Sequence, residues 1–386
     1  MTRHRHLVVV LSAAILLMAG LARNAPGAPA ADPSTAPPAD DARAFRNAVD
    51  RAINFLQTKA QTPDGAYSPK TGIGVTAVVT AGILRHGRSP DDPLVARSLK
   101  HLAGFVQPDG GIYQPGTFYK NYETSLCVAC FAAANKDGRY AKLLAGAGRF
   151  LKGIQWDEGE GHEKSSYSYG GAGYGRHKRP DLSNTSFFID ALKASGSGAD
   201  DEALKKALVF VSRCQNLETE HNTTKFASKN PDGGFYYTPA DAGDSKAGET
   251  PEGGLRSYGS MTYAGLKSMI YAGVGPDDPR VKAALKWARS HYDLKSNPGL
   301  GDTGLYYYYH TFAKALDAAG VDRVEDADGV QHDWRRELRQ ELLRRQQPDG
   351  SWVNQKAARW LEGDPSLVTG YVLLTLDYVR PDRDRK

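Results

Sequence analysis

The chain has 386 residues, of which 40% are hydrophobic and 24% are charged, and its formal net charge is +5. This composition is typical of a globular protein and excludes an intrinsically disordered chain. The charge is mild and Lys and Arg form no stripe along the sequence, so we exclude nucleic acid as a partner.

The first 22 residues have the features of an export signal. Arg3 and Arg5 form a basic start, and an apolar run extends from Leu7 to Leu21. A transmembrane helix needs about 20 apolar residues, and this run is shorter. We therefore predict a signal peptide over 1–22, an Ala/Pro-rich linker over 23–41 and a secreted or periplasmic protein. The alternative is an uncleaved N-terminal anchor, which would make a membrane surface a partner.

A sequence unit recurs six times between residues 42 and 380. The unit consists of an amphipathic helix, a Gln (missing from the fifth copy), a turn followed by an aromatic residue, and a helix that is apolar nearly all round. Four copies have an Asp-Gly turn, the third has a long Gly-rich insertion, and the fifth is degenerate at 297–299. Asp-Gly supplies the left-handed residue that ends a helix or forms a tight turn. The sequence therefore predicts six helical hairpins.

The two kinds of helix predict how these hairpins assemble. A helix without a polar face must be buried on both sides, whereas an amphipathic helix covers it from outside. An open solenoid would need polar capping repeats, but the first and last units are as apolar as the middle ones. We predict an all-α fold over residues 42–380, an α/α toroid of about six hairpins with an outer and an inner ring.

The repeat resembles the QW motif of the terpenoid cyclase and protein prenyltransferase superfamily, over essentially the whole mature chain. The resemblance implies that the Gln of each unit ties a helix end to its neighbour. It assigns this role to Gln57, Gln107, Gln155, Gln215 and Gln347, with Trp352 as the best aromatic match. It also implies that an isoprenoid-like or other apolar small molecule binds in a central cavity.

The catalytic motifs of that superfamily are absent from this sequence. No Asp-x-Asp-Asp occurs, and residues 309–311 (Tyr-His-Thr) match only one element of the prenyltransferase zinc site. The region that should hold the Asp-x-Cys pair reads Arg-Ser-Tyr at 256–258. A zinc site needs three or four protein ligands, so His310 alone does not form one. We predict no metal and no cofactor.

Candidate binding residues lie at the starts of the predicted inner helices, where the mouth of the cavity is expected. Arg176, in a basic run, and Arg256 are candidates for binding an anion. Asp181 is a candidate N-cap, Glu123 lies in a first helical turn, and Tyr258 precedes an apolar helix.

The fifth inner helix, over 305–316, has the densest polar pattern. His310, Lys314 and Asp317 share one face at helical spacing, with Tyr306 or Tyr307 above them and Tyr309 adjacent. Buried polar groups need partners, which would be one another, Lys267 or Asp190 on neighbouring helices, or a substrate. We assign His310, Asp317 and Glu123 as candidate catalytic residues. The candidate ligand-binding residues are Arg176, Asp181, Arg256, Tyr258, Tyr306, Tyr309 and Lys314.

These residues leave three functions open. The first is an exported protein that binds an isoprenoid or other apolar ligand, with or without transforming it, since tyrosines stabilise a developing carbocation. The second is a carbohydrate-active enzyme, which needs two carboxylates flanking a cleft, and Glu123 and Asp181 are the available pair. The third is a non-catalytic scaffold that binds a peptide or a surface polymer.

Overall fold

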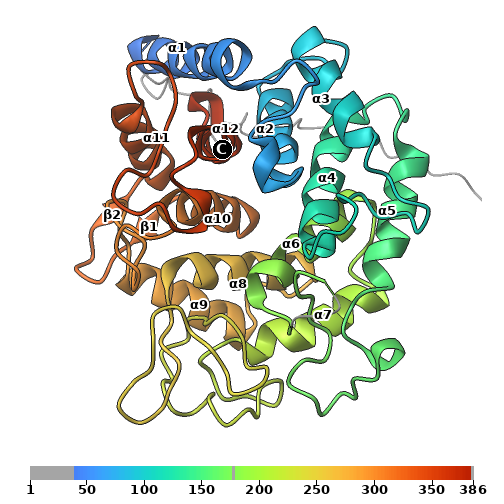
Figure 1. The fold of residues 1–386 in the computed structure, drawn as a ribbon. Helices are drawn as coiled ribbons and strands as arrows, with labels where there is room; N and C mark the ends of the chain where they lie inside the picture. Colours follow the sequence, from blue (N-terminus) through green and yellow to red (C-terminus); the bar gives the residue numbers. More distant parts are fainter. Residues whose placement is uncertain (1–38, 176–178, 384–386) are drawn as a thin grey trace, which may run out of the picture. The chain divides into compact units, whose positions relative to one another are not determined.

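Twelve α-helices alternate between an outer and an inner position in the computed structural model, which describes residues 39–175 and 179–383 (Figure 1). The outer helices are α1 (Ala39–Phe55), α3 (Pro93–Ala103), α5 (Ala141–Lys152), α7 (Glu202–Arg213), α9 (Pro279–Ser290) and α11 (Trp334–Arg345). The inner helices are α2 (Gly74–Arg85), α4 (Lys120–Ala134), α6 (Leu182–Ala194), α8 (Gly259–Tyr271), α10 (Leu305–Ala318) and α12 (Pro365–Tyr378). Each outer helix with the inner helix after it forms one of the six predicted hairpins.

The inner helices form a closed ring. Each packs against the next along the chain, and α12 packs against α2. The outer layer closes in the same place, where α1 contacts α11. There Arg339, which is buried, pairs with Asp41 at 2.7 Å, and the Gln346 Nε2 donates to the Ala48 carbonyl at 2.9 Å. These contacts confirm the predicted α/α toroid.

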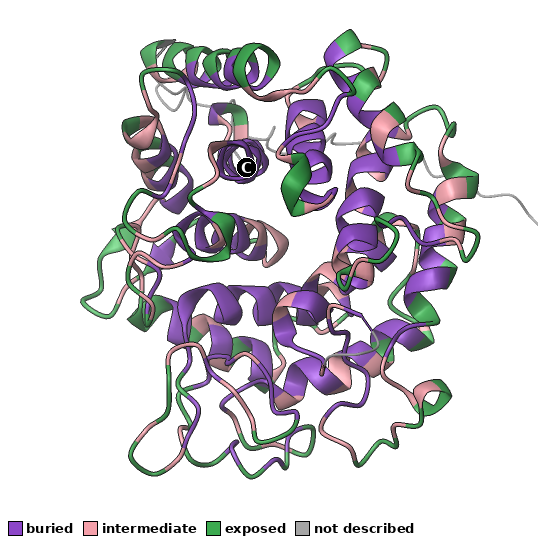
Figure 2. Ribbon diagram, viewed as in Figure 1, coloured by how far each residue is buried: buried purple, intermediate pink, exposed green. Residues whose placement is uncertain are grey.

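Burial follows the sequence pattern of the two helix types (Figure 2). Helix α12 is buried at every position from Ser366 to Tyr378, and α2 is buried from Gly74 to Leu84. The outer helices are buried on one face only, because their polar faces point to solvent. Several outer helices begin after an Asp whose carboxylate accepts a backbone N–H, as Asp92, Asp201 and Asp278 do.

The turns between the helices of each hairpin confirm the predicted role of two glutamines. The Gln155 Nε2 donates to the carbonyls of Gly170 and Ala203, at 2.8 and 2.9 Å. The Gln215 Nε2 donates in the same way to Gly233 and to Arg280, at 2.9 and 2.8 Å. Each glutamine therefore fastens its own turn to the start of the next outer helix.

Three of the predicted glutamines were assigned incorrectly. Gln57 is exposed, and Gln61 binds the next outer helix through the Leu94 carbonyl at 2.8 Å, because a π-helical turn (Leu56–Ala60) prolongs α1 past Gln57. Gln346 makes this contact in the sixth unit, while the Gln347 Nε2 reaches only the Arg345 carbonyl. Gln107 donates within its own turn, to the carbonyls of residues 105 and 113.

A few short elements join the helices. The strands β1 (Val324–Glu325) and β2 (Gln331–His332) form an antiparallel pair between α10 and α11. The all-α prediction omits this pair, because strands of two residues are too short to show the alternation of polar and apolar residues that identifies a strand in a sequence. The 3₁₀ turns are Pro69–Thr71, Glu158–Glu160, Arg359–Leu361 and Pro381–Arg383.

The predicted signal peptide lies outside the described residues, as does the linker up to residue 38. Helix α1 begins at Ala39, within the last residues predicted as linker. Across the described ranges, none of the helices is long and apolar enough to cross a membrane.

Candidate functional site

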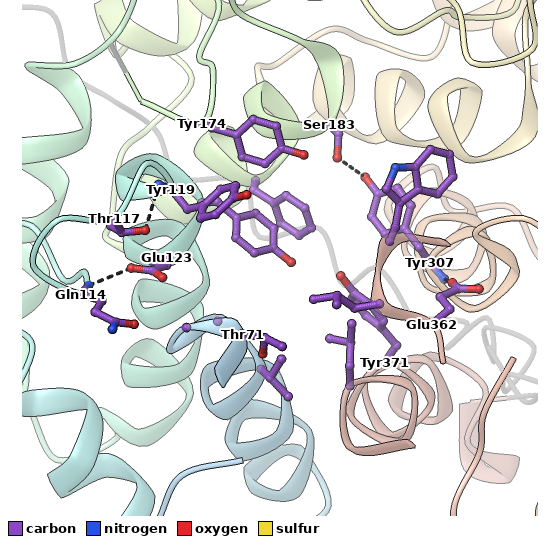
Figure 3. Close-up of a pocket in the computed structure, with 18 of the residues that line it drawn as sticks. Thr71, Gln114, Thr117, Tyr119, Glu123, Tyr174, Ser183, Tyr307, Glu362 and Tyr371 are labelled. Carbon is purple, nitrogen blue, oxygen red and sulfur yellow. Dashed lines mark hydrogen bonds between the residues drawn. The ribbon is translucent and has the colours of Figure 1, made fainter. Parts of the chain in front are cut away.

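A cavity of about 680 Å³ opens at the N-terminal ends of the inner helices (Figure 3). Every inner helix contributes a residue of its first turn to the lining, namely Gly74, Tyr122, Ser183, Ser260, Tyr307 and Leu367. Loops 114–119 and 360–362 complete the wall, and Lys70 and Lys246 add two cationic side chains to it. The cavity therefore lies on the axis of the ring, where the predicted candidates were expected.

Four aromatic rings from four inner helices form a collar in this cavity. Tyr122 contacts Phe187 edge to face with ring centroids 5.3 Å apart, Phe187 lies 6.0 Å from Tyr307, and Tyr307 lies 6.1 Å from Tyr371. The Tyr307 hydroxyl shares a 3.1 Å hydrogen bond with the Ser183 hydroxyl. Burial raises the pKa of the Tyr122, Tyr307 and Tyr371 hydroxyls, so all three are neutral.

Two buried glutamates lie on opposite sides of the cavity (Figure 3). The Glu123 carboxylate accepts the Gln114 N–H at 2.8 Å. The Glu362 carboxylate accepts the N–H groups of Tyr306 and Tyr307, each at 2.8 Å, and the Asn354 Nδ2 at 2.7 Å. Burial raises the pKa of both carboxyls, and these hydrogen bonds oppose the rise. Both carboxylates therefore hold backbone in place, in loop 114–117 and at the start of α10.

Asp181 lies directly behind the wall of the cavity. It is the N-cap of α6 and accepts the backbone N–H and the side-chain Nδ2 of Asn184, at 2.8 and 2.7 Å. Burial, and then the charge of the nearby Asp181 carboxylate, raise the pKa of Tyr237, which does line the cavity. Burial raises the pKa of Asp181 to about 6, and the hydrogen bonds from Asn184 limit the rise. Asp181 therefore caps α6 and has no direct place in the lining.

We expect the titration of Asp181 to be visible in the stability of the protein. Because the folded-state pKa of about 6 is above the unfolded value of 3.8, the folded state binds the proton more tightly. The stabilisation is present below pH 4 and is lost as pH rises through 6, by up to ~3 kcal/mol. Urea unfolding of wild type and Asp181→Asn between pH 4 and 8 measures it, since Asn also caps a helix. A difference between the two proteins that is constant with pH would contradict this assignment.

An ion cluster connects three inner helices deeper in the ring. The Asp190 carboxylate of α6 pairs with Lys267 of α8 at 2.6 Å and with Lys314 of α10 at 2.7 Å. The predicted partners of the polar face of α10 are thus confirmed for Lys314. His310 lies beside this cluster, and burial together with the charge of Lys314 holds its pKa well below the usual value. His310 and Lys314 do not line the large cavity.

The remaining candidates of the fifth inner helix point elsewhere. Asp317 pairs with Arg335 at 3.1 Å and with Arg383 at 3.3 Å, at the C-terminal end of α10. The rings of Tyr306 and Tyr309 pack together edge to face, and the Tyr309 hydroxyl donates to the Leu294 carbonyl at 2.5 Å. None of these three side chains is in the lining of the cavity.

Of the other candidates, Tyr258 and Glu123 line the cavity. The exposed Arg256 donates from its Nε to the Glu249 carbonyl at 3.0 Å, away from the lining, and Arg176 lies outside the described residues. The structure thus brings Glu123 and Tyr258 together with Asp181 behind them. The catalytic and binding roles predicted for these residues stay predictions.

Sequence reasoning did not select most of the aromatic lining, which includes Tyr119, Tyr122, Tyr174, Tyr237, Trp360 and Tyr371. One signal was available, because the first turns of all six inner helices occupy the same position in the repeat. Applying that position to every unit would have selected Tyr122 and Tyr307. No comparable signal exists for Glu362, whose carboxylate reaches the start of a helix more than fifty residues earlier in the chain.

Within the described ranges, no group of three or more His, Cys, Asp or Glu side chains is arranged to hold a metal ion. Cys127, Cys130 and Cys214 are free and buried. The lining of the cavity offers tyrosine hydroxyls, aromatic faces, two lysines and two glutamates.

Comparison with known proteins supports the fold. No family model and no curated protein matches the sequence. Among solved structures, a family 88 glycosyl hydrolase from Bacteroides vulgatus is 11% identical with a TM-score of 0.52, covering 88% of this chain and 99% of that one. A family 76 glycoside hydrolase from a bovine Bacteroides thetaiotaomicron strain is 11% identical with a TM-score of 0.50, covering 87% and 77%. The protein is an α/α toroid with a tyrosine-lined axial cavity.

The resemblance to terpenoid cyclases is also found among these structures. Type II terpene cyclase MstE from Scytonema is 15% identical with a TM-score of 0.33, covering 88% of this chain and 99% of that one. A similarity of this degree says nothing about the activity of the chain.

Proposed function

We propose that this toroid binds an isoprenoid or another apolar ligand in its axial cavity. The aromatic collar of Tyr122, Phe187, Tyr307 and Tyr371 carries the proposal. It supplies wide apolar faces, and its neutral hydroxyls can orient a single polar group of the ligand. The volume of about 680 Å³ is in the range of small-molecule pockets.

The carboxylates of the cavity favour this ligand over a sugar undergoing hydrolysis. Glycoside hydrolysis uses two carboxyl groups that flank the scissile bond, one acting on the leaving group. Here Glu123 and Glu362 are both occupied by backbone N–H groups, and Asp181 lies behind Tyr237. The aromatic lining remains the larger part of the surface offered to a ligand.

A thermal-shift panel tests the proposal on the purified mature protein. The panel contains squalene, a polyprenyl diphosphate, acidic and neutral oligosaccharides, and zinc. A ligand that binds only the folded state stabilises it by ~2.7 kcal/mol at 100 times its dissociation constant. We expect one of the isoprenoids to raise the melting temperature. A rise with an oligosaccharide alone would replace the proposal with the carbohydrate alternative, and no rise with any compound would favour the scaffold.

Two variants locate the binding site. Tyr307→Leu keeps an apolar side chain but removes a collar ring and its hydroxyl, so we expect the isoprenoid affinity to fall about two- to tenfold, since an aromatic contact contributes ~0.5–1.5 kcal/mol. Tyr309→Leu is the matched control, because Tyr309 lies on the same helix but outside the lining. Equal losses of affinity in both variants would place the ligand somewhere other than the axial cavity.

A further inference from the structure

A second, much smaller cavity lies next to the ion cluster of Asp190, Lys267 and Lys314. Its volume is about 10 Å³, which is room for one water-sized species. Its lining includes these three residues, together with Tyr263 and His310. It also includes Phe187 and Tyr307, so the aromatic collar separates it from the large cavity.

The charges around this small cavity do not balance. Two ammonium groups, Lys267 and Lys314, face one carboxylate, Asp190, which leaves one positive charge over. The side chain of Lys267 is 3% exposed, and those of Lys314 and Asp190 are each 14% exposed. Solvent therefore compensates little of the surplus positive charge. Arg85, whose charge also lowers the pKa of His310, pairs with Asp377 at 3.1 Å, and Arg380 shares that carboxylate at 2.8 Å. Burial lowers the pKa of Lys267 to about 8 although Asp190 opposes the shift.

Hydrogen-bond donors are also left over at the same place. The His310 Nδ1 is buried and has no partner among the described residues. Lysine has three donors, and Lys314 uses one on Asp190, while Lys267 uses two, on Asp190 and on the Ser186 carbonyl at 3.0 Å. An occupant that accepts from several donors and carries a negative charge satisfies both the charge and the hydrogen bonds.

We propose that this small cavity binds a single monatomic monovalent anion, with chloride as the physiological candidate, held by Lys267, Lys314 and the His310 Nδ1–H. The volume excludes phosphate, sulfate and carboxylates, and the surplus of donors excludes a cation. The site is separate from the proposed ligand cavity and does not depend on that ligand. Its role is to complete the junction of α6, α8 and α10.

Anion-dependent stability tests this site. The melting temperature of the mature protein is measured at pH 7 and constant ionic strength while chloride replaces gluconate, and then while bromide replaces gluconate. We expect a saturating rise of roughly 2–4 °C. In Lys314→Met the cluster becomes a neutral pair of Lys267 and Asp190, so the rise should disappear. The control Lys136→Met makes the same change in net charge on an exposed residue and should retain it.

Two results would overturn the proposal. Equal melting temperatures in chloride and gluconate would mean that water fills the cavity. A rise that persists unchanged in Lys314→Met would mean that the anion binds elsewhere. A crystal grown with bromide gives an independent readout, since the anomalous peak is expected between Lys267, Lys314 and His310.

Discussion

Replacing Asp190 by Ala is expected to reduce the free energy of unfolding by about 3–5 kcal/mol. The carboxylate is the shared partner of Lys267 and Lys314, and its loss leaves two buried ammonium groups without their acceptor. Urea unfolding of the purified protein at pH 7 measures the loss. The loss should be smaller above pH 8, because the pKa of Lys267 is about 8 and the neutral amine needs no counter-charge.

Two further variants separate the ion cluster from a general effect of charge. Asp137→Ala removes an exposed carboxylate that pairs with Arg139, and it should leave the unfolding free energy nearly unchanged. The triple variant Asp190→Leu, Lys267→Met, Lys314→Met removes the whole cluster and should recover most of the stability, since apolar replacement of a complete buried ion group is often neutral. A loss in Asp190→Ala no larger than in Asp137→Ala would show that the lysines find other partners.

The second large effect is expected at Gly350, which lies in the turn between α11 and α12 where this turn packs against α1. Its φ is +95°, and a Cβ there would lie 2.4 Å from the Arg51 carbonyl oxygen. Gly350→Ala therefore combines a left-handed alanine, at ~1–2 kcal/mol, with overpacking at ~1–3 kcal/mol. We expect urea unfolding of this variant to show a loss of about 2–5 kcal/mol.

Gly138→Ala is the matched control for this position. Gly138 has a φ of +81° but nothing lies within 4 Å of its Cβ position, so only the backbone strain applies and the expected loss is ~1–2 kcal/mol. The excess loss in Gly350→Ala measures how tightly the last turn packs on the first outer helix. Equal losses in the two variants would mean that the ring is not closed at α1 and α11.

Apolar packing of the inner helices and the polar contacts between helices stabilise this structure in different ways. The apolar inner helices bury each other in any register that keeps their faces together, because the hydrophobic effect has no direction. The bonds of Asp190 to two neighbouring helices do have a direction, as do those of Gln155 and Gln215 to the next outer helix. These polar contacts therefore fix the relative positions of helices that apolar packing alone would leave adjustable.

The fold could be predicted because each of its signals is local. An Asp-Gly turn requires a left-handed residue whatever surrounds it, and an apolar helix beside an amphipathic one can be buried in few ways. Helical spacing and the rule that buried charges need partners left several pairings open for Lys314, and the structure selects Asp190 among them.

The residues of the site could be predicted only in part, because a small rotation of a helix about its axis changes which of its side chains point into the cavity. Tyr306, Tyr307 and Tyr309 are near neighbours in the sequence, yet only Tyr307 lines the cavity. The helix turns about 100° per residue, so adjacent tyrosines point in different directions and the pattern does not show which direction is inward. The same holds for Gln346 and Gln347, of which only the first reaches α1.

The sequence by itself determined the helix types, their alternation and the closure of the ring, since these depend on the polarity of each helix and on turns that each segment forms alone. Only the tertiary structure decided which side chains meet on the axis. Glu362 at the start of α10, Tyr371 against Tyr307, and the shared carboxylate of Asp190 each join residues far apart in the chain. Such contacts depend on how the helices pack in three dimensions, which no local pattern of residues records.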